Sequence, residues 1–263
     1  MRRALKVGGG ILAAVISIGV ILVGWVAFLK VFDVQPFIGK GPGDVWNWLF
    51  TADDAGAHRA LMRHESYTTL RDAFLGLLFG TIAAVLTAIS FNLYKPLQRT
   101  FMPIAMVLRS VPLVAMTPLI VLIFGRGLTA VTVIAGIVTF FPTLVNVTLA
   151  LRDTPKESMD LLRAYGASPL RTLAKVQIPS SLPALFASLR VAAPLALVGA
   201  LLSEWLATGK GLGYAIIQAG ALSDYNGLWS RVALVTIYSV VLYKAIGGLE
   251  GVVLKRFAAV APR

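Results

Sequence analysis

Long stretches without charged residues constrain this sequence more than any other feature. The first, residues 8–29, runs for 22 residues with no charge. At about 1.5 Å per residue, a helix of that length crosses a hydrocarbon core about 30 Å thick. Further apolar stretches cover residues 73–93, 101–124, 128–151, 182–207 and 232–254. Because such isolated segments satisfy their backbone hydrogen bonds only as helices, the sequence predicts an all-α integral membrane protein with six transmembrane helices.

The composition supports this class. Apolar residues make up 57% of the chain and charged residues only 14%, which excludes an ordinary water-soluble domain. The net charge of +12 comes from cations that lie between the apolar stretches, so it indicates membrane topology rather than nucleic-acid binding. With both termini in the cytoplasm, more Lys and Arg residues lie on the inner side than on the outer side, as the positive-inside rule requires.

Two longer polar segments separate the predicted helices, and neither is large enough for a catalytic domain. Residues 30–72 form the predicted extracytoplasmic loop, in which residues 42–50 are expected to form a surface helix at the lipid headgroups. His58 and His64 lie in this loop without tight ligand spacing, so no metal site is predicted. The sequence has no Walker A phosphate-binding motif and no cysteine, which excludes thiolate metal sites and cysteine nucleophiles.

The second polar segment, residues 152–181, is the predicted cytoplasmic loop between the fourth and fifth helices. Residues 154–157 form a capping-box pattern that predicts a helix start, and Gly166 is expected to end that helix. Ser168 predicts the start of a second short helix, which Pro179 is expected to end. We therefore expect two short, stiff helices that meet at a glycine bend.

The second of these helices is predicted to be amphipathic. Leu170, Leu173 and Ala174 fall on one face, while Arg171 and Lys175 fall on another. An apolar stripe with basic flanks is typical of a surface that docks a partner protein.

This loop resembles the pattern E-A-A-x3-G-x9-I-x-L-P of the permease subunits of ABC importers. Residues 160–162 (Asp-Leu-Leu) stand at the E-A-A position, Gly166 at the glycine and residues 176–179 (Val-Gln-Ile-Pro) at the end of the pattern. The spacing matches throughout, although Asp replaces Glu and leucines replace both alanines. The resemblance covers about residues 38–255. Segments that look like the nitrate, taurine and aliphatic-sulfonate branch of these permeases are residues 118–125, 140–142, 166–168 and 211–214.

The resemblance implies a type I ABC importer permease fold with cytoplasmic coupling helices, in the inner membrane of a prokaryote. It implies a cytoplasmic ABC ATPase dimer, an extracytoplasmic solute-binding protein and a second permease as partners. A homodimer is expected, and pairing with a different permease stays open. The permease would not be an enzyme, because ATP and magnesium would bind to the ATPase. The residues that the resemblance places in ATPase coupling are Asp160, Arg163, Ala164, Gly166, Ala167, Ser168, Leu170, Arg171, Leu173 and Pro179.

Several residues at membrane depth are candidates for the solute path. A charge within the bilayer is costly, so Arg109 and Glu204 each need a role, in the path or at the interfaces, where Arg109 would reach the headgroups. Pro112, Pro118 and Pro142 are expected to break backbone ladders. Weaker path candidates of the same kind are Phe140, Phe141 and Asn146.

Two glycine patterns in the sequence bear on how the helices pack. The G-x-x-x-G patterns at residues 76–80 and 247–251 predict close helix contacts.

A self-contained secondary transporter or channel remains the alternative, although the sequence shows no internal repeat. A membrane enzyme would need paired carboxylates or a nucleophile with its base at membrane depth, and none is visible. The solute stays open among nitrate, taurine, alkylsulfonates, bicarbonate and other small molecules.

Overall fold

The computed structural model describes the backbone of residues 2–258 and the side chains of residues 15–162 and 164–255. Within these ranges every regular element is a helix, which confirms the all-α prediction for the described part of the chain. The chain divides into two compact units. The first contains the chain up to Arg63 together with Ile216–Ala233, and the second contains His64–Ala215 together with the chain from Leu234 onward.

The first unit contains α1 (Arg2–Val31), α2 (Pro42–Trp46), the π-helix η1 (Asn47–Thr51) and the beginning of α3 (Ala55–Leu93). The helix predicted over residues 42–50 is therefore confirmed. Trp25 stacks on Trp229 at 5.4 Å between ring centroids, and the Trp229 indole N–H donates to the carbonyl of Ile38 at 2.8 Å. His58 stacks on Trp48 and lies 3.1 Å from the Asp54 carboxylate. Aromatic contacts thus hold this unit together.

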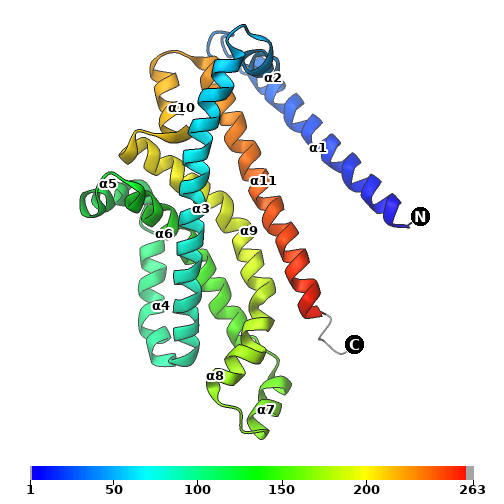
Figure 1. The fold of residues 1–263 in the computed structure, drawn as a ribbon, viewed down its shortest axis with the longest axis vertical. Coiled ribbons are helices and arrows are strands. Elements are labelled where there is room, and N and C mark those ends of the chain that lie inside the picture. Colours follow the sequence, from blue (N-terminus) through cyan, green and yellow to red (C-terminus); the bar gives the residue numbers. More distant parts are fainter. Residues whose placement is uncertain (1, 259–263) are drawn as a thin grey trace. The chain divides into compact units, whose positions relative to one another are not determined.

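The core of the second unit lies between α6 (Leu128–Arg152) and α9 (Ile178–Ser203), which run side by side along their length (Figure 1). Near one end, Leu144, Val147 and Leu151 of α6 pack with Ala84, Ala88 and Phe91 of α3 and with Leu173. A second cluster joins Val131 of α6 with Ala196, Leu197 and Ala200 of α9. Small alanine side chains let these helices approach closely.

Glycines allow a close contact between helices in this core, as the pattern at residues 76–80 predicts. A Cβ atom at Gly76 would lie 2.3 Å from the Cβ of Ala135, and one at Gly80 would lie 2.5 Å from the Gly136 carbonyl oxygen. The Thr139 hydroxyl lies 3.3 Å from the Gly76 carbonyl oxygen, across the same contact. The contact of α3 with α6 therefore leaves no space for a side chain at either glycine.

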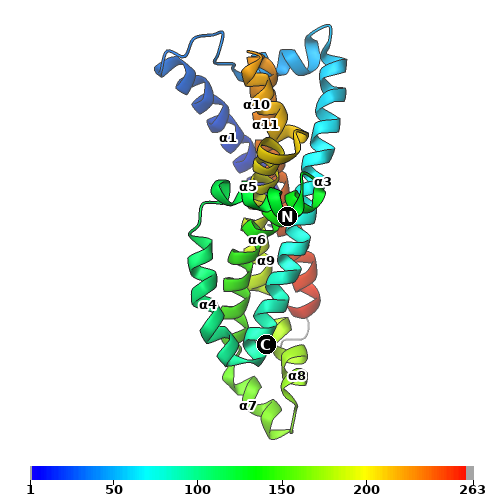
Figure 2. The ribbon, with the colours of Figure 1, turned by 90° about the vertical axis from the view of Figure 1, so that its left-hand side faces the viewer.

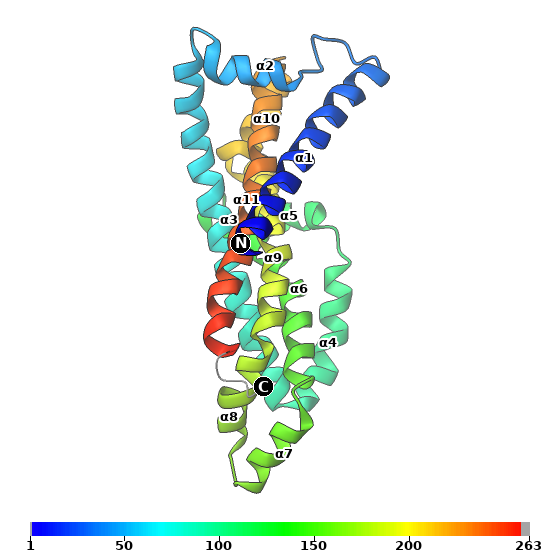
Figure 3. The same cartoon turned by 90° about the vertical axis from the view of Figure 1, so that its right-hand side faces the viewer.

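Packing of residues 247–251 against a helix of the same subunit is not found, because the glycines of that pattern contact no helix backbone of this chain. A Cβ at Gly251 would meet nothing within 4 Å, and one at Gly247 would meet only the Arg190 guanidinium. The reason lies in α11 (Tyr225–Ala258), whose most apolar stretch is not buried in the structure. Its later part runs beside α9 (Figure 3), where Glu250 forms an ion pair with Arg190.

The third predicted span is broken into two helices. It consists of α4 (Lys95–Arg109), which runs beside α6 (Figure 2), and α5 (Leu113–Phe124), and these are bent by 106° relative to each other. The break falls at Pro112, as predicted. Pro118 and Pro142, in contrast, lie inside continuous helices. Each removes one hydrogen bond from the ladder, because proline has no backbone N–H, but neither interrupts its helix.

The segment after the loop forms one continuous helical run. It starts with α8 (Pro169–Thr172), continues through η2 (Leu173–Gln177), α9 and η3 (Glu204–Thr208), and precedes α10 (Gly211–Ala221). The expectation that Pro179 ends a helix is wrong. In the π turn before it, the Ile178 N–H bonds to the Leu173 carbonyl, which shifts the hydrogen-bond register by one residue and accommodates the missing N–H of proline.

Four helices within the described residues are long and apolar enough to cross a membrane, and the bent α4–α5 pair makes a fifth if it forms one broken span. The four are α3, α6, the run from Pro169 to Thr208, and α11 up to Lys255. The segment Val15–Val31 of α1 is a shorter apolar helix. The chain is thus a multi-pass membrane protein, and the count of six crossings stays a prediction.

Candidate functional site

The loop after α6 forms two helical segments joined at a glycine, as the sequence predicts. The first is α7 (Lys156–Ala164), and the second begins with α8. Gly166 has a φ of +67° and the Ala167 N–H donates to the Leu162 carbonyl at 2.9 Å, which is the hydrogen bond of a Schellman C-cap. A Cβ at Gly166 would meet no atom within 4 Å. Glycine is therefore favoured here by backbone conformation and not by lack of space.

The start of α8 is capped by its own sequence. The Ser168 hydroxyl accepts a hydrogen bond from the Arg171 N–H at 3.4 Å, and Pro169 occupies the first turn. These contacts fix the direction of the chain as it leaves the glycine bend. The bend and the cap together define the direction of the chain between α7 and α8.

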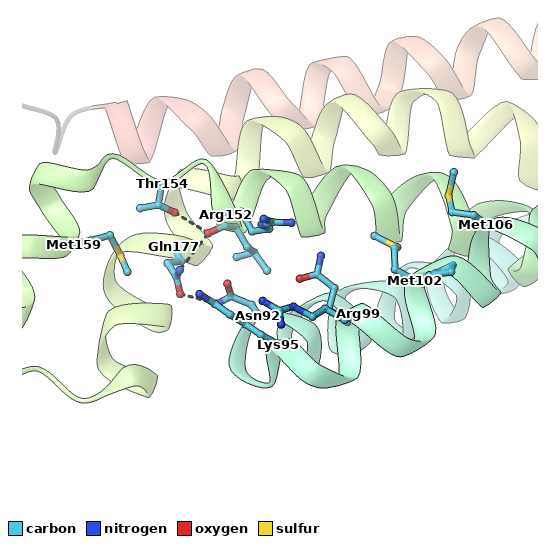
Figure 4. A pocket seen from close by; sticks show the side chains of 12 residues that line it. Asn92, Lys95, Arg99, Met102, Met106, Arg152, Thr154, Met159 and Gln177 are labelled. Carbon is cyan, nitrogen blue, oxygen red and sulfur yellow. Dashed lines mark hydrogen bonds between the residues drawn. The ribbon is translucent and has the colours of Figure 1, made fainter.

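Buried polar contacts hold the base of the loop (Figure 4). The Gln177 side chain donates to the Leu151 carbonyl at 3.2 Å and accepts from the Asn92 amide at 2.8 Å. The Thr154 hydroxyl donates to the same Leu151 carbonyl at 3.1 Å. The ends of α3 and α6 are thereby joined to η2. Nothing local in the sequence marks Gln177 and Asn92 as partners, because they lie 85 residues apart in the chain.

The exposed surface of the loop contains most of the predicted coupling residues. Those that are exposed are Asp160, Ala164, Gly166, Ser168, Leu170 and Arg171. Ala167 and Pro179 are half-buried, and the Arg163 side chain lies outside the described residues. Leu173 is buried in the core cluster with Leu151, so its predicted place on the docking face is wrong.

Large apolar side chains are exposed on both sides of the glycine bend. Leu161 is 58% exposed, Tyr165 82% and Leu170 65%. We call these three residues the loop apolar surface. Leu161 and Tyr165 lie four residues apart, on one face of α7 and its end. Apolar side chains exposed on a capped, rigid loop are typical of a surface that a partner protein covers.

The predicted path residues lie at several separate places. Arg109 is exposed at the last turn of α4, directly before the break at Pro112. Phe140 lines an apolar cavity of about 660 Å³ and contacts the Phe141 ring edge-on, with 5.2 Å between centroids. Asn146 is exposed on α6. The described contacts do not bring these side chains into one site within this chain.

Glu204 is buried and hydrogen-bonded within the protein. Its side chain is 0% exposed, and one carboxylate oxygen accepts from the Thr69 hydroxyl at 2.9 Å and from the Gly213 N–H at 2.8 Å. The Thr69 oxygen in turn accepts from the Leu212 N–H at 2.9 Å. A Cβ at Gly211 would lie 2.3 Å from the Glu204 carboxyl carbon. Glu204 therefore ties α3 to the start of α10 and does not line an open surface.

Comparison with known proteins agrees with the loop pattern. The chain is 30% identical over 239 residues to a probable ABC transporter permease protein of Haemophilus influenzae, covering 91% of this chain and 95% of that protein. It is 29% identical to the riboflavin transport system permease protein RibX of Chloroflexus aurantiacus, covering 89% and 86% of the two chains. It is 27% identical to the nitrate import permease protein NrtB of Synechococcus elongatus, covering 73% and 65%.

The fold is also similar to that of a solved transporter. A chain of the methionine ABC transporter MetNI, in an inward-facing conformation, superposes with a TM-score of 0.67 at 22% identity, covering 75% of this chain and 98% of that chain. Residues 76–258 match the family model described as the binding-protein-dependent transport system inner membrane component. The likeness to permeases of the nitrate and sulfonate branch, inferred from the loop and the segments around it, is confirmed. The chain therefore belongs to the family of binding-protein-dependent transport system inner membrane components, as a permease subunit of an ABC importer.

Proposed function

We propose that this permease moves a small solute inward when a separate cytoplasmic ATPase dimer pushes on α7 and α8. The observation that carries the proposal is the loop apolar surface, Leu161, Tyr165 and Leu170, which is exposed on a loop with a fixed shape. A groove on the ATPase would cover these side chains. In this scheme ATP and magnesium bind to the ATPase, and the permease itself carries out no chemical reaction.

The base of the loop supports a mechanical role. A push on α8 passes directly into α9, because the helix continues from Pro169 to Thr208. The hydrogen bonds of Gln177 connect the same point to the ends of α3 and α6. Displacement of the loop would therefore move three helices together, as rigid-body coupling between two sites requires.

The solute path is proposed to lie at an interface with a second permease copy, most simply an identical one. The broken α4–α5 pair supports this, because broken helices in transporters commonly line the path. Arg109, Pro112, Phe140, Phe141 and Asn146 remain the candidates for its wall. The solute is proposed to be a small molecule such as nitrate, an alkylsulfonate or taurine, or another small organic molecule, delivered by an extracytoplasmic binding protein. The names of the relatives, which include riboflavin and nitrate permeases, support this range.

The proposed membrane arrangement has six crossings with both termini in the cytoplasm. The excess of Lys and Arg on the proposed inner side supports it. The loop apolar surface then faces the cytoplasm, where the ATPase is located, and the loop that contains α2 faces outward, where the binding protein docks.

A photo-crosslinking experiment tests the docking surface and the orientation together. Because the chain has no cysteine, Tyr165→Cys introduces a unique thiol that can carry a benzophenone maleimide. We expect illumination of membranes that contain the whole importer to join this position to the ATPase. The matched control is Tyr67→Cys, at a position 68% exposed on α3, which should give no ATPase product.

Two outcomes would contradict the proposal. One is labelling of Tyr165→Cys by a membrane-impermeant maleimide in intact cells, since this would place the loop outside. The other is the absence of any ATPase crosslink at Tyr165 in a complex that still hydrolyses ATP. Uptake of solute by the permease without ATP would favour the alternative of a self-contained transporter or channel.

A further inference from the structure

A cavity of about 810 Å³ lies beside the base of the loop, within the second unit (Figure 4). Its walls come from the end of α3, the first three turns of α4, the end of α6, Met159 of α7 and Gln177 of η2. The docking of an ATPase does not explain this cavity, because the loop apolar surface does not line it. Its chemistry therefore needs an explanation of its own.

One end of the cavity is strongly basic. Lys95, Arg99 and Arg152 gather there in Figure 4, and no carboxylate is among the lining residues. Within the described side chains, none of the three cations forms an ion pair. Three uncompensated positive charges around one cavity favour a ligand with negative charge, and two arginines suit the oxygens of a phosphate group.

The rest of the wall along α4 is apolar. Met102 and Met106 lie one helical turn apart and follow α4 away from the cations (Figure 4), with Pro103 between them. Methionine side chains adapt to flexible apolar ligands. The cavity thus has a basic part and an apolar part in sequence along one helix, which matches a ligand with an anionic head and a hydrocarbon tail.

The position of the cavity beside the ends of the apolar helices suits a lipid ligand. The apolar helices α3 and α6 end beside it, at Leu93 and Arg152, and α4 begins there at Lys95. The ends of spanning helices lie where hydrocarbon gives way to headgroups, whichever side of the membrane this is. An anionic lipid from the adjoining leaflet reaches this position without leaving the bilayer.

We propose that this cavity binds an anionic phospholipid, with its phosphate between Lys95, Arg99 and Arg152 and its acyl chains along Met102 and Met106. Basic pockets between transmembrane helices on the cytoplasmic side are suited to such headgroups. A free anion such as phosphate shares the headgroup chemistry but leaves the methionine wall unused. The lipid also contacts α7 through Met159, so its presence stabilises the loop that the proposed function uses. The binding itself does not depend on that function.

The test uses the purified full-length permease and native mass spectrometry with added phosphatidylglycerol or phosphatidylcholine. We expect one phosphatidylglycerol to be retained per chain in preference to phosphatidylcholine. The double variant Arg99→Gln/Arg152→Gln should weaken phosphatidylglycerol binding roughly 30-fold, the effect of removing two cations near an anionic headgroup. Arg99→Lys/Arg152→Lys should keep most of the binding, which shows that charge and not folding is responsible.

Matched controls separate a lipid from other occupants. Lys175→Gln/Lys255→Gln removes two exposed cations that do not line the cavity and should leave phosphatidylglycerol binding unchanged. Met102→Asn/Met106→Asn should weaken binding of phosphatidylglycerol, and millimolar inorganic phosphate should not displace the lipid. Equal binding by the Arg99/Arg152 and Lys175/Lys255 double variants would overturn the proposal. So would full displacement by phosphate with no effect of the methionine changes, because that result identifies a site for a free anion.

Discussion

Single residues in this permease show which features are encoded locally. Gly166 is recognisable in the sequence because helices commonly end at a glycine in the left-handed conformation, and the structure has a φ of +67° there. Glu204 is different. Its charge at membrane depth suggests a path residue, but its partners Thr69 and Gly213 bury it completely. The sequence shows that such a charge needs partners without showing which ones.

Substitution of Gly166 tests the shape of the bend. Gly166→Leu places a side chain at positive φ, which costs about 1–2 kcal/mol, while the space around the position is open. The protein should still insert and fold, but ATPase activity stimulated by the binding protein should fall roughly tenfold, because the docking conformation becomes that much rarer. Gly166→Asn is the matched control, since asparagine tolerates this conformation, and it should keep most of the activity in proteoliposomes. Normal stimulation of the Leu variant would show that the bend does not matter.

Substitution of Glu204 tests whether its hydrogen bonds join α3 to the start of α10. Glu204→Ala leaves the Gly213 N–H without an acceptor and the Thr69 hydroxyl with only the Glu65 carbonyl of its own helix. The free energy of unfolding should therefore fall by about 1–3 kcal/mol. Glu204→Gln keeps an acceptor oxygen, so its free energy of unfolding should fall by less than that of Glu204→Ala. Tryptophan fluorescence during thermal unfolding in detergent measures both. Ser203→Ala is the control, because the buried Ser203 hydroxyl bonds only within its own helix to Gly199. Equal melting temperatures of the Glu204→Ala and Ser203→Ala proteins would show that Glu204 does not join the two helices.

Helices in the second unit approach each other through small residues, which is the element-scale feature that the sequence predicts only in part. The two G-x-x-x-G patterns are alike in sequence, yet the glycines at residues 76–80 pack against the α6 backbone, whereas those at 247–251 contact no helix backbone. Glu250 of the second pattern reaches α9 only through its side chain, in the ion pair with Arg190. The difference arises from which face of each helix meets a neighbour, and that is decided by the tertiary arrangement. Periodicity identifies a helix more readily than it identifies the partner of that helix.

Alanine substitutions at the two kinds of glycine should therefore differ. Gly80→Ala inserts a methyl group against the Gly136 backbone and Thr139, which forces α3 away from α6 and should lower stability by about 1–3 kcal/mol. Gly248→Ala on α11 meets nothing within 4 Å and should be neutral or slightly stabilising, because alanine is the better helix former. Thermal unfolding of the two variants in the same detergent compares them directly. A Gly80→Ala protein as stable as the Gly248→Ala protein would contradict the packing.

At the scale of the whole molecule, the sequence predicts the class and the family more completely than the interior. Apolar stretches and the loop pattern depend on neighbouring residues, so the all-helical fold and the permease family follow from them. The hydrogen bond from Asn92 to Gln177 joins residues 85 positions apart, and that from Thr69 to Glu204 joins residues 135 positions apart. No local pattern specifies such pairs. The 106° bend at Pro112 was indicated only as a break, because a proline interrupts a helix without setting the new direction.

The unbroken helix from Pro169 to Thr208 sets how force travels in this permease. At the rise of an α-helix, forty residues extend at most about 60 Å, with the glycine bend just before one end and the buried Glu204 carboxylate near the other. If the loop end is pushed as proposed, a continuous helix tilts as one body, so a small tilt at the loop end becomes a sideways displacement at the far end. In the proposed scheme the ATPase would then move the region around Glu204 through this one helix, without a second connecting element.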